Sequence, residues 1–115
     1  MGDGDDLTSV TAVLDDEYAR SILAATSRES LGATELAARI DADVSTVYRR
    51  LDRLESLDLV TTTIDVRRDR HHAKRYRARL RRVTVELRDG EFHVAVDRER
   101  DDPADRLTDL FEELR

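Results

Sequence analysis

Within DADVSTVYRRLDRL, residues 41–54, the side chains suited to ligand binding recur at helical spacing. Ser45, Arg49 and Arg53 stand in one line four residues apart, with Thr46 beside them. The opposite face of such a helix carries an apolar stripe of Val44, Val47, Leu51 and Leu54. In the major groove of DNA, Ser45, Thr46 and Arg49 fall near base edges, where an arginine can make a paired hydrogen bond to guanine.

The same segment holds two further basic side chains near the groove walls. Arg50 and Arg53 are placed to meet phosphates, and Tyr48 lies between the polar and apolar faces. The alternative is a solvated helix face on which Asp52 and Glu55 balance the arginines. The elements on either side of the segment favour the DNA-binding interpretation.

Before the segment, the pattern predicts a second helix joined to it by a short turn. Thr34 is the expected N-cap of TELAARI, and Asp43 that of a longer helix ending near Leu57. The longer helix is expected to cross close to residue 37, where Ala37 provides the small side chain that this approach needs. Asp41 stands where the turn usually has a glycine, and it is expected to adopt a left-handed backbone conformation. Residues 34–57 therefore read as a helix-turn-helix.

After the segment, apolar residues alternate with polar ones, which predicts two β-hairpins. Residues 60–80 form a wing with a charged tip. Residues 83–97 form a second hairpin around Asp89-Gly90, a type I′ turn signal. Because the apolar parity slips between the hairpins, Arg81-Arg82 should mark a bulge or bend.

The basic wing tip is a second candidate DNA contact, along the backbone or in the minor groove. Its residues are Arg67, Arg68, Arg70, Lys74 and Arg75. The alternative is a solubilising loop between edge strands. His71 and His72 are read as polar or phosphate-facing residues, and no metal site is expected.

The two ends of the chain add helices. Residues 1–6 are expected to be disordered, a short helix starts at Leu7, and the main first helix runs from about 16 to 26. Asp102 and Pro103 begin a terminal helix, residues 103–114, with an apolar stripe on one face. At 115 residues, the whole should form a single domain spanning 7–115.

Composition narrows the functional class. The chain has no cysteine, no apolar run that could cross a membrane, and an acidic start unlike a signal peptide, so we expect a cytoplasmic protein. No catalytic constellation appears, so neither an enzyme nor a cofactor is expected.

Charge is unevenly distributed along the chain. The net charge is -6, yet residues 45–82 hold twelve basic against five acidic residues, a local charge of +7. This asymmetry is typical of a protein with one positively charged surface that binds a polyanion such as a nucleic acid. Lys74 is the only lysine, and an acidic, arginine-rich surface is typical of proteins from salt-loving microbes; ordinary acidity from a GC-rich genome is the alternative.

The stretch LAARIDADVSTVYRRLDRLESLDLV resembles the winged helix-turn-helix regulators of the ArsR-like group. It is most similar to small versions in halophilic archaea, through LDDEYARSILAATS, TVYRR, YRARL and RDGEFHV. The resemblance covers residues 14–115 and implies an α+β winged helix-turn-helix that binds double-stranded DNA as a dimeric transcriptional regulator. Metal sensing is not carried over, because the chain lacks the cysteines of the founding members and its terminal helix has no histidine.

The resemblance also implies a two-fold interface made by the first and last helices, which would place two recognition helices one DNA turn apart on a near-palindromic site. The residues expected there are Leu7, Val10, Leu14, Leu107, Leu110, Phe111 and Leu114. Alternatively, the two helices bury one another within a monomer.

A competing function is a winged-helix protein-interaction module whose second hairpin pairs with the sheet edge of another protein. The sequence names neither the operator nor an effector.

Overall fold

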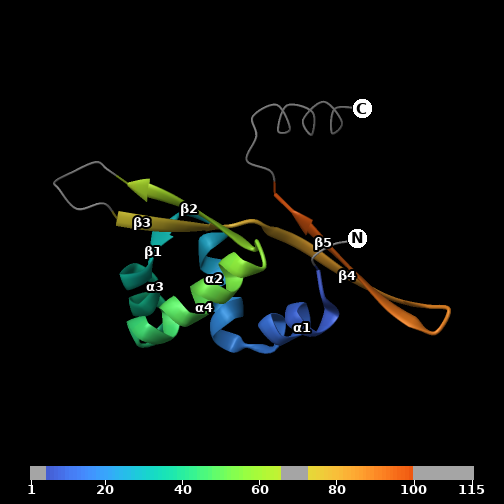
Figure 1. Ribbon diagram of the computed structural model, residues 1–115. Helices are drawn as coiled ribbons and strands as arrows, with labels where there is room; N and C mark the ends of the chain where they lie inside the picture. Colours follow the sequence, from blue (N-terminus) through green and yellow to red (C-terminus); the bar gives the residue numbers. More distant parts are fainter. Residues whose placement is uncertain (1–4, 66–72, 100–115) are drawn as a thin grey trace, which may run out of the picture.

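The structure is a computed structural model that describes residues 5–65 and 73–99. Four helices form one side of the molecule, and strands run along the other (Figure 1). The helices are α1 (Leu7–Asp15), α2 (Glu17–Thr26), α3 (Ala33–Ile40) and α4 (Val44–Ser56). The strands are β1 (Leu31–Gly32), β2 (Val60–Asp65), β3 (Ala73–Ala78), β4 (Leu80–Arg88) and β5 (Glu91–Arg98).

Aspartates begin both N-terminal helices. The Asp6 carboxylate accepts a hydrogen bond from the Ser9 N–H at 3.0 Å, and that of Asp16 accepts from the Tyr18 N–H at 3.2 Å. The predicted break between α1 and α2 is therefore confirmed. The prediction of disorder through residue 6 is wrong at its end, because Asp6 caps α1 and Asp5 pairs with Arg98.

The helix-turn-helix is confirmed as α3 and α4, with shifted bounds. Asp41 has φ 57°, the left-handed conformation expected of the turn. Asp43 occupies the N-cap position of α4, although its side chain makes no capping hydrogen bond. Thr34 is not a cap: α3 begins one residue earlier, at Ala33, and its first turn is tied by a hydrogen bond from the Gly32 N–H to Glu35 at 2.9 Å.

The core lies where α4 meets α2, α3 and the wing strands. Val47, Leu51 and Leu54 of α4 are completely buried there. Val44 was expected in the same stripe, and this prediction is wrong, since 43% of its surface is exposed. It stands in the first turn of α4, just after the helix-turn-helix turn.

The wing is a three-stranded antiparallel sheet in the order β1-β3-β2. Between α2 and α3, Leu31 and Gly32 form a short strand that pairs with Tyr76 and Arg75 of β3. Leu31 and Tyr76 are both buried, so this pairing joins the wing sheet to the hydrophobic core. The predicted hairpin 60–80 is confirmed in its strands, while Leu80 belongs to the next strand.

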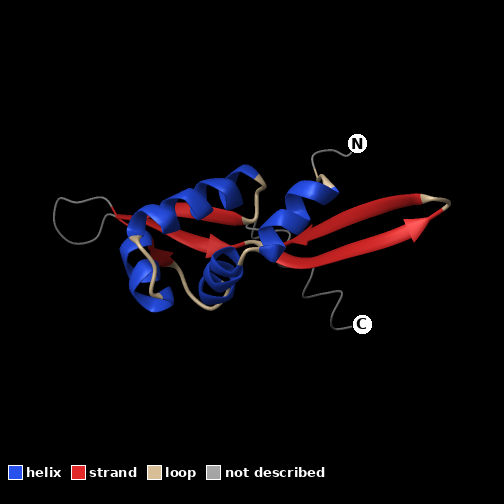
Figure 2. Ribbon diagram, turned by 90° about the horizontal axis from the view of Figure 1, so that it is seen from below, coloured by secondary structure: helices blue, strands red, loops and turns tan. Residues whose placement is uncertain are grey.

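The second hairpin is β4 paired with β5, longer than the predicted 83–97. The register shifts between Leu80 and Arg82, which confirms the bulge. Asp89 (φ 54°) and Gly90 (φ 79°) both have positive φ, as the predicted type I′ turn requires. In Figure 2 this hairpin extends well past α1, away from the other helices.

These elements form an α+β winged helix-turn-helix with an additional hairpin. The predicted terminal helix, residues 103–114, and residues 66–72 of the wing tip lie outside the described residues. Of the helices at residues 5–65 and 73–99, none is long and apolar enough to cross a membrane.

Candidate nucleic-acid interface

The helix α4, called the recognition helix below, presents a polar outer face over its buried stripe. Ser45, Arg49 and Arg53 are exposed, Thr46 is half-buried, and Tyr48 is 49% exposed. The predicted line of polar side chains thus lies on one side of a helix whose other side is fixed in the core. No other residue at 5–65 or 73–99 makes an ion pair with Arg49 or Arg53.

Arg50 differs from its neighbour Arg49 because it has a partner within the chain. Its Nε donates to Asp16 Oδ2 at 2.5 Å, and its guanidinium lies 5.6 Å from the centre of the Tyr18 ring. Burial acts to raise the pKa of Asp16, but the hydrogen bond and charge of Arg50 outweigh it and hold this pKa below its ordinary value. Arg50 therefore fastens the recognition helix to the start of α2.

Two predicted wing residues also face the body of the protein. Lys74 Nζ is 3.7 Å from Glu55 of the recognition helix and 5.5 Å from the centre of the Tyr76 ring. Burial raises the pKa of Tyr76. Arg75 donates to the Ser30 carbonyl at 2.7 Å and lies 3.5 Å from a Glu35 carboxylate oxygen.

These contacts anchor the outer end of β3, next to the wing tip, to its neighbours. The remaining predicted wing contacts, together with both tip histidines, lie outside the described residues: Arg67, Arg68, Arg70, His71 and His72. Among the residues that are described, no group of three or more His, Asp or Glu could hold a metal ion.

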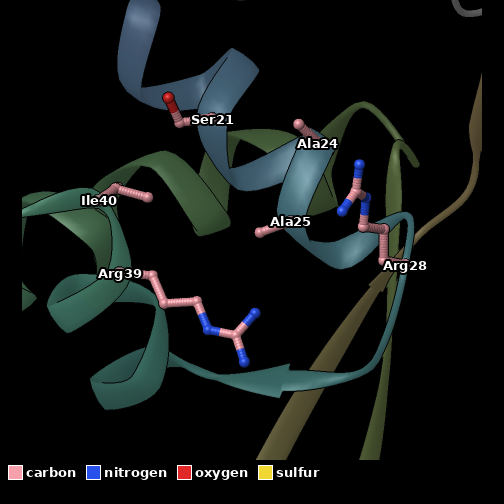
Figure 3. A pocket seen from close by; sticks show the side chains of 6 residues that line it. All are labelled: Ser21, Ala24, Ala25, Arg28, Arg39 and Ile40. Atoms are coloured by element: carbon pink, nitrogen blue, oxygen red, sulfur yellow. The ribbon is translucent and has the colours of Figure 1, made fainter.

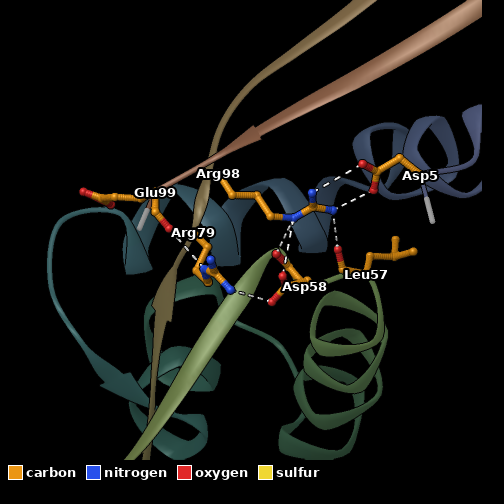
Figure 4. Close-up of polar contacts among 6 residues, drawn as sticks. All are labelled: Asp5, Leu57, Asp58, Arg79, Arg98 and Glu99. Atoms are coloured by element: carbon orange, nitrogen blue, oxygen red, sulfur yellow. Dashed lines mark hydrogen bonds and ion pairs between the residues drawn. The ribbon is translucent and has the colours of Figure 1, made fainter. Parts of the chain in front are cut away.

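A cluster that the sequence did not predict joins the second hairpin to the end of the recognition helix (Figure 4). Arg98 donates to Asp5 at 2.7 Å, and to the Leu57 and Asp58 carbonyls at 2.8 Å each. The hydrogen bond to Asp5 is the main cause of the raised pKa of Arg98.

Arg79 completes this cluster. It donates to the Asp58 carboxylate at 2.8 Å and to the Glu99 carbonyl at 3.1 Å. We call the side chains of Asp5, Asp58, Arg79 and Arg98 the hairpin clamp. No local sequence signal could have found it, because Asp5 and Arg98 are 93 residues apart.

The residues predicted for a dimer interface divide into three groups. Leu7 and Leu14 of α1 are half-buried and can contribute surface. Val10 cannot, since only 1% of it is exposed; it packs within its own chain, and the prediction for it is corrected accordingly. Leu107, Leu110, Phe111 and Leu114 lie outside the described residues.

A shallow cleft of about 400 Å³ opens between α2 and α3. Its lining is Ser21, Ala24, Ala25, Arg28, Arg39 and Ile40, with the two arginine side chains at its border (Figure 3). Arg39 is paired with Glu29 at 3.0 Å. The cleft shares no residue with the predicted DNA-binding set, so it forms no part of the candidate interface.

Comparison with known proteins agrees with this fold. Residues 14–63 match a protein family described as a helix-turn-helix domain. Among solved structures, the chain is similar to an ArsR-like transcriptional regulator from Rhodococcus sp. RHA1, with 33% sequence identity and a TM-score of 0.53. The likeness covers 63% of this chain and 62% of that one, so the chain spans less than two thirds of that regulator's length.

No curated protein matches the chain. The family match contains α2, α3 and α4, which are the elements that build and hold the polar face described above. The chain thus carries a helix-turn-helix domain within a winged-helix fold similar to that of an ArsR-like transcriptional regulator.

Proposed function

We propose that this protein is a sequence-specific DNA-binding transcriptional regulator that acts as a homodimer on a near-palindromic site. One observation carries the proposal: the recognition helix exposes Ser45, Arg49 and Arg53 on one side and completely buries three apolar side chains on the other, those of Val47, Leu51 and Leu54. A helix held in this way can enter the major groove without losing its own packing.

In this proposal each side chain has its own role. Arg49 donates two hydrogen bonds to a guanine, while Ser45 and Thr46 contact neighbouring base edges. Arg53 contacts a phosphate at the wall of the groove, and Tyr48 contacts the DNA beside that phosphate. Arg50 reaches a phosphate only by leaving Asp16, so we assign it a smaller share of the affinity.

The wing supplies the second contact. Lys74 and Arg75 tie the outer end of β3 to Glu55, Ser30 and Glu35, which supports a wing held beside the recognition helix. We infer that Arg67, Arg68 and Arg70 follow the DNA backbone or enter the minor groove. The dimer contact includes Leu7 and Leu14 of α1 and the apolar residues of 103–114.

The charge distribution supports a high-salt setting, which we include in the proposal. In concentrated salt, counterion release adds little to binding, so phosphate contacts alone sustain little affinity. Direct contacts from Arg49 must then supply most of the selectivity. The acidic remainder of the chain opposes non-specific association with DNA.

The test is selection of binding sites from a randomised duplex pool, followed by titration of the selected site. We expect one enriched motif, and we expect Arg49→Ala to weaken binding about 5- to 150-fold and to relax the preference at one base pair. Arg88→Ala removes the same charge from the exposed tip of the second hairpin and should change affinity less than about twofold. A pool that yields no motif contradicts the proposal.

The competing function, a protein-interaction module, is favoured by the exposed apolar side chains of the second hairpin. It predicts that Arg49→Ala has no effect on function. The same titration therefore separates the two functions.

A further inference from the structure

The hairpin β4–β5 has one face built entirely from apolar cross-strand pairs. The pairs are Val83 with Val96, Val85 with Val94, and Leu87 with Phe92. We call these six side chains the hairpin face. Toward the turn they are strongly exposed: Val85 by 47%, Leu87 by 66% and Phe92 by 61%.

The opposite face is mostly polar, with Thr84 opposite Ala95, Glu86 opposite His93, and two cross-strand pairs of opposite charge, Arg82–Asp97 and Arg88–Glu91. Cross-strand pairs of this kind stabilise a face that remains in water. One face of the hairpin therefore has the apolar side chains of a protein core, and the other has the polar side chains of a protein surface.

Only the base of the hairpin face is covered by the described part of the chain. Val96 packs against the core, and α1 packs against β5. Beyond α1 the strands continue as an arm to Asp89-Gly90 (Figures 1 and 2). A two-stranded hairpin in water is marginally stable by itself, so a second surface over the outer half would stabilise it.

We propose that this surface is the hairpin face of a second copy of the chain, packed in a two-fold contact. The inference rests on the proposed function, of which it names the dimer surface. The face holds no charged side chain, so two chains of net charge -6 can meet there without placing like charges together. It also adjoins α1, whose Leu7 and Leu14 are half-buried.

The hairpin clamp gives a contact between two copies a functional consequence. Arg98 and Arg79 tie the base of the arm to Leu57 and Asp58, which directly follow the recognition helix. The direction of the arm is thereby fixed relative to that helix. Two arms joined by a two-fold axis set the distance between two recognition helices, and hence the spacing of the half-sites.

The first test is sedimentation equilibrium of the full chain and of two variants, Leu87→Asp and Phe92→Asp. We expect a dimer for the natural chain and a dimer dissociation constant raised about 100-fold or more by either variant, because each substitution acts twice in a two-fold contact. The matched control Thr84→Asp, on the exposed polar face, should remain a dimer.

Since Leu87 and Phe92 are exposed in a single chain, both variants should keep the natural circular dichroism spectrum. If residues 100–115 of the same chain cover the hairpin face, the variants lower the melting temperature and leave association unchanged. That result overturns the proposal, as does a monomeric natural chain.

Cysteine cross-linking gives an independent readout, because the chain has no cysteine of its own. Under mild oxidation, Val85→Cys or Leu87→Cys should form disulfide-linked dimers, whereas Thr84→Cys should not. Equal cross-linking at all three positions overturns a specific contact.

Titration on a single half-site distinguishes failure of this surface from failure of the proposed function. If the surface is correct, Leu87→Asp loses tight binding to the paired site and keeps binding to one half-site. A variant that still dimerises and still binds the paired site overturns the surface and leaves DNA binding intact. A natural chain that dimerises through the hairpin face but selects no DNA overturns the function alone.

Discussion

The recognition helix and the hairpin β4–β5 use apolar side chains in opposite ways. In the recognition helix, Val47, Leu51 and Leu54 are fully buried by the same chain, and what remains exposed is mostly polar. In the hairpin, Leu87 and Phe92 remain more than half exposed. The first element packs its apolar side chains within one chain, whereas the second leaves apolar side chains exposed in the described part of the chain. We have proposed DNA as the ligand of the first and a second copy of the chain as the partner of the second.

The largest contrast between the two elements should appear in leucine truncations. We expect Leu51→Ala to lower the free energy of unfolding by about 2–5 kcal/mol, since it leaves a cavity in the core. Leu87→Ala, at concentrations where the chain is monomeric, should cost less than about 0.5 kcal/mol. Urea denaturation measures both values, and equal losses would remove the contrast.

The hairpin clamp joins the two elements, so Arg98→Ala sharpens the comparison. The substitution removes hydrogen bonds to Asp5 and to two backbone carbonyls. We expect a loss of about 1–3 kcal/mol in the free energy of unfolding. As a control, Arg88→Ala removes an exposed ion pair with Glu86 and an exposed cross-strand neighbour of Glu91, and it should lie within about 0.5 kcal/mol of the natural chain. Similar values for both variants would mean that the clamp does not hold the arm.

Within the recognition helix, adjacent arginines should separate stability from binding. Arg50→Ala breaks the contact with Asp16 and should cost about 1 kcal/mol of unfolding free energy, whereas Arg49→Ala should change it little. In DNA titrations the order should reverse, with the greater loss for Arg49→Ala. Both orders can be checked by chemical denaturation and fluorescence anisotropy on the same preparations. If Arg50→Ala loses as much affinity as Arg49→Ala, the assigned roles are wrong.

The smallest expected effect is on the pH dependence of stability. Because Arg50 holds the pKa of Asp16 below its ordinary value of 3.8, the folded state binds this proton less readily than the unfolded chain. The resulting stability is present above pH 3.8 and is lost as the pH falls through the lower folded value. Asp16→Asn should flatten this part of the acid-denaturation curve, and Asp15→Asn, an exposed neighbour, should leave it unchanged.

Elements governed by local pattern could be predicted from the sequence. Helical spacing located the recognition helix, alternation located both hairpins, and the shift in parity located the bulge beside Arg82. The left-handed conformation of Asp41 followed from its place in a short turn. In each case neighbours in sequence determine the conformation.

Features that depend on distant contacts were not predictable in this way. The strand at Leu31–Gly32 exists because β3 lies beside it, and two residues carry no periodicity. Arg50 looks equivalent to Arg49 until α2 places Asp16 beside it. Val10 was placed on an outer surface because helical spacing reveals an apolar face without revealing what covers it.

The most direct test of the central claim, that the outer face of the recognition helix reads DNA, is genome-wide DNA occupancy in the cells that make this protein. The natural chain and Arg49→Ala would be compared at equal abundance and at native salt. We predict discrete peaks that share an inverted repeat and disappear in the variant. Peaks that persist in the variant, or no enrichment for the natural chain, would contradict the claim.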